Sequence, residues 1–140
     1  EGLEGAPSRV TGLGLLDIVT VMKPQKRLAR SEAIYLPTGD TVSGYEIHIG
    51  ETTGPDCDRA WLSLDGRGEG AASADGRVRG CYLHGLFTAD AFRAAYLAEL
   101  GTALPVTNYA SGVEATLNAL ADHLEMHMDI DALLALAGEV

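Results

Sequence analysis

The chain has 140 residues, 46% of them hydrophobic, which is enough to fill the core of one domain. Its formal net charge of −10 argues against a surface for nucleic acid or for anionic membranes. The sequence contains neither a long apolar run nor a signal-peptide pattern. We therefore predict no membrane segment and a cytoplasmic protein.

The first part of the chain predicts strands. A β-branched run over 17–22 follows a glycine-rich segment and predicts a buried strand, which Pro24 is expected to end. Residues 26–50 predict a hairpin, because a turn signal at Pro37–Asp40 separates two extended segments.

The returning strand of this hairpin carries ionisable residues. Side chains alternate along a strand, so Glu46 and His48 share one face. Tyr45, Ile47 and Ile49 share the other face. Two ionisable groups side by side are typical of a site, but a solvent-facing strand edge fits the pattern equally well.

The middle of the chain predicts short strands and turns. A strand over 59–64 is followed by a glycine-rich loop over 66–70. These glycines lack the strand-to-helix setting and the lysine of a P-loop, so we reject a phosphate cradle. A second hairpin turns at Asp75–Gly76, and its returning arm, 78–83, leads directly to His84.

The last part of the chain predicts helices. The first helix covers 89–100 and is closed by Gly101. After an irregular segment over 104–111, a second helix runs from 112 to about 126, and a third follows over 129–138. The fold class is therefore α/β, with strands and hairpins followed by C-terminal helices.

His84 is the strongest candidate for a catalytic group. It ends a short apolar strand, just before a turn at Gly85 and the start of a helix. Proteins of the α/β class usually place their chemistry on such loops, and histidine exchanges protons near neutral pH. A histidine that only caps the turn fits this position equally well.

Neither cysteine is a convincing nucleophile. Cys81 lies three residues before His84, on the opposite face of a strand, and is predicted to be a small buried residue. Cys57 is flanked by Asp56 and Asp58, which raise the pKa of a thiol. The two cysteines could form one disulfide, but nothing indicates a secreted, disulfide-stapled domain.

His123 and His127 are spaced to share one face of the second helix, beside Asp122 and Glu125. That spacing can hold a metal ion. However, the glutamate does not occupy its place in an H-E-x-x-H motif, and no third ligand is evident. We therefore predict a solvated helix end and no metal site.

Four separated stretches, in the same order, resemble the C-terminal glutamine amidotransferase domain of the cobyric acid synthase family. They are residues 12–17, 43–50 with 53–56, 73–76 and 82–87. Residues 1–5 resemble the family's segment just after its nucleophile elbow, so the resemblance runs from Glu1 to about Leu100. The related cobyrinic acid a,c-diamide synthases have a different version of the motif at 45–50, so they are the second choice for the family that this sequence resembles.

The resemblance implies an incomplete class I glutamine amidotransferase-like domain with a flavodoxin-like α/β fold. Residues 1–140 would be its C-terminal portion, with a helical tail over about 102–140. In the family, a cysteine attacks the amide of glutamine, and a histidine activates that cysteine. The released ammonia passes to an ATP-dependent synthetase domain that amidates corrin carboxylates. ATP and Mg would bind in that other domain, and this chain would hold no cofactor.

The resemblance also implies roles for individual residues. The family's catalytic histidine matches His84, and Glu46, His48 and Tyr45 would have supporting or substrate-binding roles. The nucleophilic cysteine would lie upstream of this chain, so the chain alone is expected to be inactive. Leu86 stands where related amidotransferases carry a glutamate, which favours a Cys–His dyad or a third group from elsewhere.

Two other functions stay open. One is an amidotransferase that acts on another acid, such as cobyrinic acid or a cell-wall substrate. The other is a non-catalytic interaction domain that has kept the fold. Loss of upstream strands would expose an apolar edge or face of the sheet, which predicts that the chain associates with itself.

Overall fold

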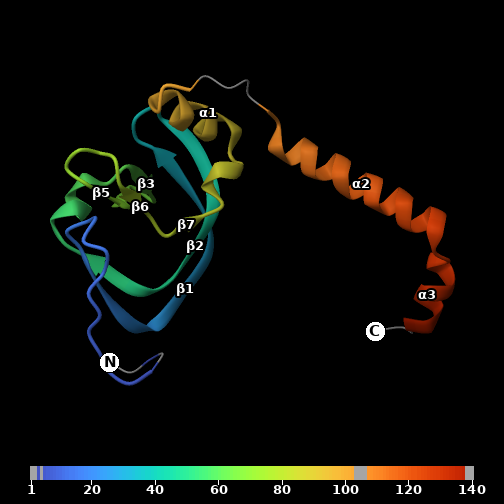
Figure 1. The fold of residues 1–140 in the computed structure, drawn as a ribbon, viewed down its shortest axis with the longest axis horizontal. Coiled ribbons are helices and arrows are strands. Elements are labelled where there is room, and N and C mark those ends of the chain that lie inside the picture. The colour runs from blue at the N-terminus through green and yellow to red at the C-terminus, as the bar shows by residue number, and fades with distance from the viewer. Residues whose placement is uncertain (1–2, 4, 103–106, 138–140) are drawn as a thin grey trace. The chain divides into compact units, whose positions relative to one another are not determined.

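A computed structural model describes residues 3, 5–102 and 107–137 (Figure 1). The chain divides into two units, Glu1–Pro105 and Val106–Val140, and each is described by itself. The predicted opening segment 1–5 and the predicted irregular segment 104–111 lie partly outside the described residues.

The first unit is built on a five-stranded sheet with the order β4-β3-β1-β2-β7 and a separate β5–β6 pair. The strands are β1 (Val19–Tyr35), β2 (Asp40–Thr53), β3 (Leu62–Leu64), β4 (Arg67–Glu69), β5 (Ala71–Ala72), β6 (Arg79–Gly80) and β7 (Leu83–His84). Two 3₁₀ turns, Pro55–Arg59 and Leu86–Thr88, and the helix α1 (Asp90–Glu99) complete it. All strand pairs among the described residues are antiparallel.

The second unit consists of the helices α2 (Tyr109–His127) and α3 (Ile130–Ala137). Strands and hairpins therefore precede C-terminal helices, which confirms the predicted α/β class. None of the helices in the described part of the chain has the length and hydrophobicity needed to cross a bilayer.

The long β1–β2 hairpin confirms the turn predicted at Pro37–Asp40, since Tyr35 pairs with Asp40 on the two sides of that turn. The prediction that Pro24 ends the first strand is wrong. β1 continues through Pro24, and its register with β2 shifts between Met22 and Arg27. Proline has no N–H to donate, so a strand tolerates it where an irregularity interrupts the ladder.

Two further strand predictions are wrong. The strand predicted over 17–22 begins at Val19, which is exposed rather than buried. The predicted loop over 66–70 contains β4, which pairs with β3 across a tight turn. Asp65 and Gly66 both have positive φ in that turn, at 51° and 76°. A two-residue turn of this kind matches the twist of a hairpin.

The second hairpin turns at Asp75–Gly76 as predicted, and Ala71 pairs with Gly80. Its returning arm, however, is not one strand. β6 pairs with β5, whereas β7 pairs with β2. His84 therefore ends a strand of the large sheet, at its edge.

The helices differ from the predictions mainly at their ends. α1 is confirmed, and Gly101 follows it with a φ of 80°. α2 begins at Tyr109 rather than at 112, because the Asn108 side chain caps it by accepting a hydrogen bond from Ser111 N at 2.9 Å. α3 is also present, although its predicted end at Gly138 lies outside the described residues.

Strand register defines two faces of the sheet, because directly paired residues share a face. The inner face carries Thr20, Arg27, Ala29, Ser31, Ala33, Tyr35, Val42, Gly44, Glu46, His48, Gly50, Thr52 and Leu83. The outer face carries Val19, Val21, Leu28, Arg30, Glu32, Ile34, Thr41, Ser43, Tyr45, Ile47, Ile49, Glu51 and His84.

The hydrophobic core lies against one end of the inner face. Tyr35 and Phe92 of α1 are both fully buried, and their ring centroids are 4.9 Å apart in an edge-to-face contact. Trp61, Leu62 and other buried side chains complete the cluster. Contacts of this kind stabilise the fold by burying apolar area and by ring geometry.

Candidate functional site

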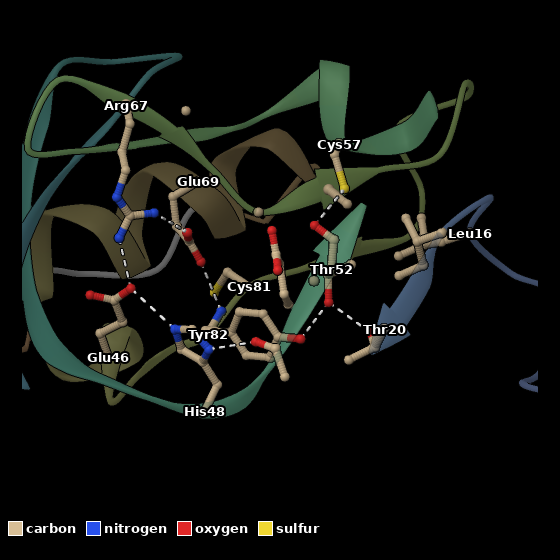
Figure 2. Close-up of a pocket in the computed structure, with 17 residues that line it drawn as sticks. Leu16, Thr20, Glu46, His48, Thr52, Cys57, Arg67, Glu69, Cys81 and Tyr82 are labelled. Carbon is tan, nitrogen blue, oxygen red and sulfur yellow. Dashed lines mark hydrogen bonds and ion pairs between the residues drawn. The ribbon is translucent and has the colours of Figure 1, made fainter. Parts of the chain in front are cut away.

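A cavity of about 520 Å³ lies on the inner face, beyond the core, between β2, β4 and the segment around Tyr82 (Figure 2). Its lining combines the ionisable side chains Glu46, His48, Arg67 and Glu69 with apolar groups. Pockets with a few converging polar groups are the usual place for ligands.

Glu46 is the centre of the charged part of this cavity. It is only 3% exposed, so the solvent-facing alternative is wrong for this residue. Its carboxylate accepts hydrogen bonds from Arg27 Nε at 3.0 Å and from Arg67 Nη2 at 2.7 Å, and His48 Nε2 lies 3.3 Å away. Burial by itself would raise the pKa of Glu46, but these partners outweigh burial and lower it.

His48 is held by acceptors at both ring nitrogens. Nδ1 lies 2.8 Å from Gly50 O, and Nε2 lies 3.3 Å from the carboxylate of Glu46. Both contacts are hydrogen bonds only when the ring is protonated, since a carbonyl and a carboxylate can only accept. The ring also stacks on Tyr82, with centroids 4.3 Å apart. His48 is therefore held in place by two acceptors and by the Tyr82 ring, beside the carboxylate of Glu46.

Arg67 joins two buried carboxylates. Its Nη2 donates to Glu46, and its Nη1 donates to Glu69 Oε2 at 3.0 Å. Burial alone would lower the pKa of Arg67, but the hydrogen bonds and charges of Glu46 and Glu69 raise it. Glu69 is 8% exposed, and its other oxygen accepts from Tyr82 N at 3.0 Å.

Sequence reasoning missed Arg67 and Glu69, because it treated 66–70 only as a rejected phosphate cradle. The signal that could have found them is Asp65–Gly66 between two short extended runs. Such a dipeptide predicts a hairpin, and alternation would then put Arg67 and Glu69 on one face of its second strand.

The other end of the cavity carries hydroxyl and thiol groups. Thr20 Oγ1 and Thr52 Oγ1 are 2.7 Å apart, and the hydroxyl of Tyr82 also contacts Thr52. Cys57 Sγ points to Thr52 O at 3.9 Å, and burial, followed by Asp58 and Asp56, raises the pKa of its thiol. The effect predicted for the acidic neighbours is confirmed, although burial contributes more.

Cys81 also lines this cavity, and both cysteines are free thiols. Burial raises the pKa of the Cys81 thiol, whose Sγ lies 3.6 Å from Leu83 O. A thiol with a raised pKa is mostly protonated at neutral pH and is a poor nucleophile. The prediction that neither cysteine is an activated nucleophile agrees with these environments.

His84 lies outside this cavity. It is exposed at the end of β7, directly opposite Tyr45 of β2. His84 Nδ1 lies 3.0 Å from Tyr82 O, and since a carbonyl only accepts, Nδ1 carries the proton in this contact. In the neutral ring, Nε2 is then left as the basic nitrogen.

Two glycines allow this arrangement. A Cβ on Gly44 would lie 2.4 Å from His84 O, so only glycine permits β2 and β7 to approach so closely here. Gly85 follows His84 with a φ of 82°, which turns the chain away from the sheet. The strand-end position predicted for His84 is confirmed by these contacts.

The predicted site residues fall into two groups. The structure brings Glu46 and His48 together on the inner face, and it brings Tyr45 and His84 together on the outer face. It does not bring these two pairs onto one face. The supporting roles predicted for Glu46, His48 and Tyr45 therefore stay predictions, as does the catalytic role of His84.

The described residues include no metal cluster, and the glycines at 66–70 do not form a phosphate cradle. His123 and His127 have ring centroids 4.4 Å apart on α2. Across residues 3, 5–102 and 107–137, no group of three or more histidine, cysteine or acidic side chains is arranged to hold a metal ion. The glycines at 66–70 flank β4 rather than opening a helix, so they do not fit ATP phosphates either.

Comparison with known proteins adds an independent observation. A sequence profile of the CobB/CobQ-like glutamine amidotransferase domain matches residues 1–92. The cobyric acid synthase of Ruegeria sp. (strain TM1040) is 61% identical over 137 residues, which are 98% of this chain and 28% of that protein. The corresponding enzymes of Cereibacter sphaeroides (strain ATCC 17025 / ATH 2.4.3) and Bradyrhizobium diazoefficiens are 56% and 52% identical, with the same coverage.

The chain thus spans 28% of the length of these curated relatives. No solved structure matches it. The matched region of the profile covers well over half of the chain and contains Glu46, His48 and His84. The chain therefore belongs to the CobB/CobQ-like glutamine amidotransferase family.

Proposed function

We propose that this chain is the C-terminal part of a cobyric acid synthase of the cytoplasm. Its amidotransferase domain would hydrolyse glutamine and supply ammonia for the ATP-dependent amidation of corrin carboxylates. The substrate would be adenosylcobyrinic acid a,c-diamide and the product cobyric acid, in cobalamin biosynthesis. The identity of 52–61% to enzymes of that name, over 98% of this chain, supports the proposal.

The environment of the His84 ring is the main support for glutamine hydrolysis by this domain. Its imidazole is exposed, and the Tyr82 carbonyl holds Nδ1–H, so Nε2 is available as a base. His84 would take the proton of a cysteine thiol, whose sulfur attacks the amide carbon of glutamine. It would then return that proton to the leaving ammonia and take another from the water that cleaves the thioester. The net reaction consumes glutamine and water and yields glutamate and ammonia.

The nucleophilic cysteine is proposed to lie in a part of the synthase outside this chain. Cys57 and Cys81 are poor candidates, because burial raises the pKa of both thiols. The sites for ATP, Mg and the corrin substrate are assigned to the synthetase domain of the same enzyme. Consistent with this, the chain spans 28% of its curated relatives. The isolated chain is expected to bind no ATP and to be inactive.

The test is carried out in the complete synthase with ATP and the corrin substrate present. His84→Ala is expected to lower glutamine-dependent amidation by about 10²- to 10⁴-fold, while free ammonia still supports the reaction. His123→Ala, a histidine change on α2, is the matched control and should leave both activities unchanged. If His84→Ala retains glutamine-dependent activity, His84 is a turn residue and the base must be sought around His48 and Glu46.

Two rival functions are resolved by the same assay. An enzyme of the second-ranked kind would amidate cobyrinic acid or a cell-wall acid rather than the a,c-diamide. The exposed apolar side chains of the outer face, such as Leu28 at 63% exposure, favour a non-catalytic interaction domain instead. That function is favoured over an amidotransferase if the wild-type synthase releases no glutamate from glutamine with any of these acids.

A further inference from the structure

We infer that Glu69 is a positioning residue for His84, that it acts through the backbone of Tyr82, and that Arg67 holds Glu69 in place. This inference rests on the proposed function only for its kinetic consequence. A histidine base works when one ring nitrogen is held as a donor and the other is left free. In this chain the group that holds His84 Nδ1 is a backbone carbonyl rather than a carboxylate.

The Tyr82 backbone lies between β6 and β7 and is fixed on both sides. Its carbonyl accepts from His84 Nδ1 at 3.0 Å and from Ile47 N at 3.2 Å. Its N–H donates to Glu69 Oε1 at 3.0 Å. Glu69 and Ile47 thus fix the two peptide groups of Tyr82, and the second of these carries the oxygen that orients His84.

Glu69 is arranged as a rigid acceptor. It is 8% exposed, and Arg67 Nη1 binds its Oε2 at 3.0 Å, which leaves Oε1 for Tyr82 (Figure 2). The other arm of Arg67 binds Glu46 at 2.7 Å, so the guanidinium is itself held between two buried carboxylates. Because the N–H donors of a guanidinium lie in one plane, binding both carboxylates fixes the orientation of Arg67 and therefore of Glu69. Arg67 and Glu69 on the inner face are therefore connected by hydrogen bonds, through the backbone of Tyr82, to His84 on the outer face.

The decisive change is Glu69→Ala, compared with the conservative Glu69→Gln. Alanine removes the acceptor of Tyr82 N–H, whereas the amide oxygen of glutamine can still accept. In the complete synthase with ¹⁵N-labelled histidine rings, we expect Glu69→Ala to lose the Nδ1–H form of His84 and Glu69→Gln to keep it. The signal of His84 is assigned with His84→Gln.

The kinetic measurement compares the rate of amidation with glutamine as nitrogen donor and the rate with free ammonia. Glu69→Ala should lower the glutamine-dependent kcat by about ten- to a hundredfold, because a displaced base loses alignment. The KM for glutamine and the ammonia-dependent rate should change little. Glu69→Gln should restore most of the loss.

Since Glu69→Ala removes a buried group, Arg67→Ala serves as a second variant. Its side chain is 49% exposed, so truncating it removes little buried area, and it frees Glu69 to turn away from Tyr82. Arg27→Ala is the matched control, because it also removes an arginine from Glu46 but leaves Glu69 untouched. Arg67→Ala should shift the His84 tautomer and Arg27→Ala should not.

The outcomes separate this inference from the proposed function. The inference is overturned if His84 keeps its tautomer in Glu69→Ala or Arg67→Ala, whichever of the two is folded. It is also overturned if Arg27→Ala shifts the tautomer as much as Arg67→Ala does. A tautomer that shifts without any loss of glutamine-dependent activity supports the inference and overturns the proposed role of His84.

Discussion

The two faces of the β1–β2 hairpin have the same backbone and the same alternation, yet they are used in opposite ways. The inner face carries the buried residues of this hairpin, among them Val42 and Glu46 at 0% and 3% exposure, although Thr20 and Arg27 near its other end are exposed. The outer face leaves Leu28, Ile34 and Tyr45 at 63%, 40% and 52% exposure. Alternation thus creates two faces, but packing partners decide which one is buried.

The difference also concerns charge. On the inner face, the buried carboxylates of Glu46 and Glu69 have cationic or N–H partners. This is the condition under which a buried carboxylate is tolerated at all. On the outer face, His84 lies at the surface, where a substrate can reach its ring. The buried face holds its charges rigidly, and the exposed face presents the proposed base.

The largest effect is expected from the core that covers the inner face. Phe92→Ala removes a fully buried ring that packs on Tyr35, and it should lower the free energy of unfolding by about 3 to 5 kcal/mol. Tyr45→Ala, an aromatic truncation on the outer face, should cost about 0.5 kcal/mol or less. Urea unfolding measures both, and equal losses would contradict the contrast between the faces.

A smaller effect is expected from the charge of Glu46. Its pKa in the folded protein is lowered from the ordinary 4.5, so it contributes stability above pH 4.5 that is lost as the pH falls through the lowered pKa. Glu46→Gln should cost about 1 to 2 kcal/mol at neutral pH, and the difference should shrink in acid. Chemical denaturation from pH 3 to pH 7 tests this, with Glu32→Gln on the outer face as control. A gap that stays constant with pH would count against it.

The smallest effect on stability, with a clear effect on assembly, is expected on the outer face. The isolated chain should self-associate through exposed apolar side chains, and Leu28→Lys should reduce this while changing the free energy of unfolding by about 0.5 kcal/mol or less. Light scattering coupled to size-exclusion chromatography measures the mass. Thr41→Lys, at an exposed polar position of the same face, is the control, and a monodisperse wild-type monomer would refute the prediction.

Local patterns allowed much of the fold to be predicted. The turns at Pro37–Asp40 and Asp75–Gly76 and the helix α1 depend on residues close in sequence, and they were predicted correctly. Pro24 was misjudged because proline breaks a regular ladder but is tolerated at an irregular one. β4 was missed although the turn before it has a hairpin signal.

The sequence by itself determined the family, the alternation that pairs Glu46 with His48, and the strand-end position of His84. Only the tertiary structure decided that Glu46 is buried, that Arg67 and Glu69 join it, and that His84 lies on the opposite face. The physical reason is the sequence separation of the residues that interact. Turns and alternation follow from neighbouring residues, whereas burial and ion pairing follow from contacts between segments far apart in the chain.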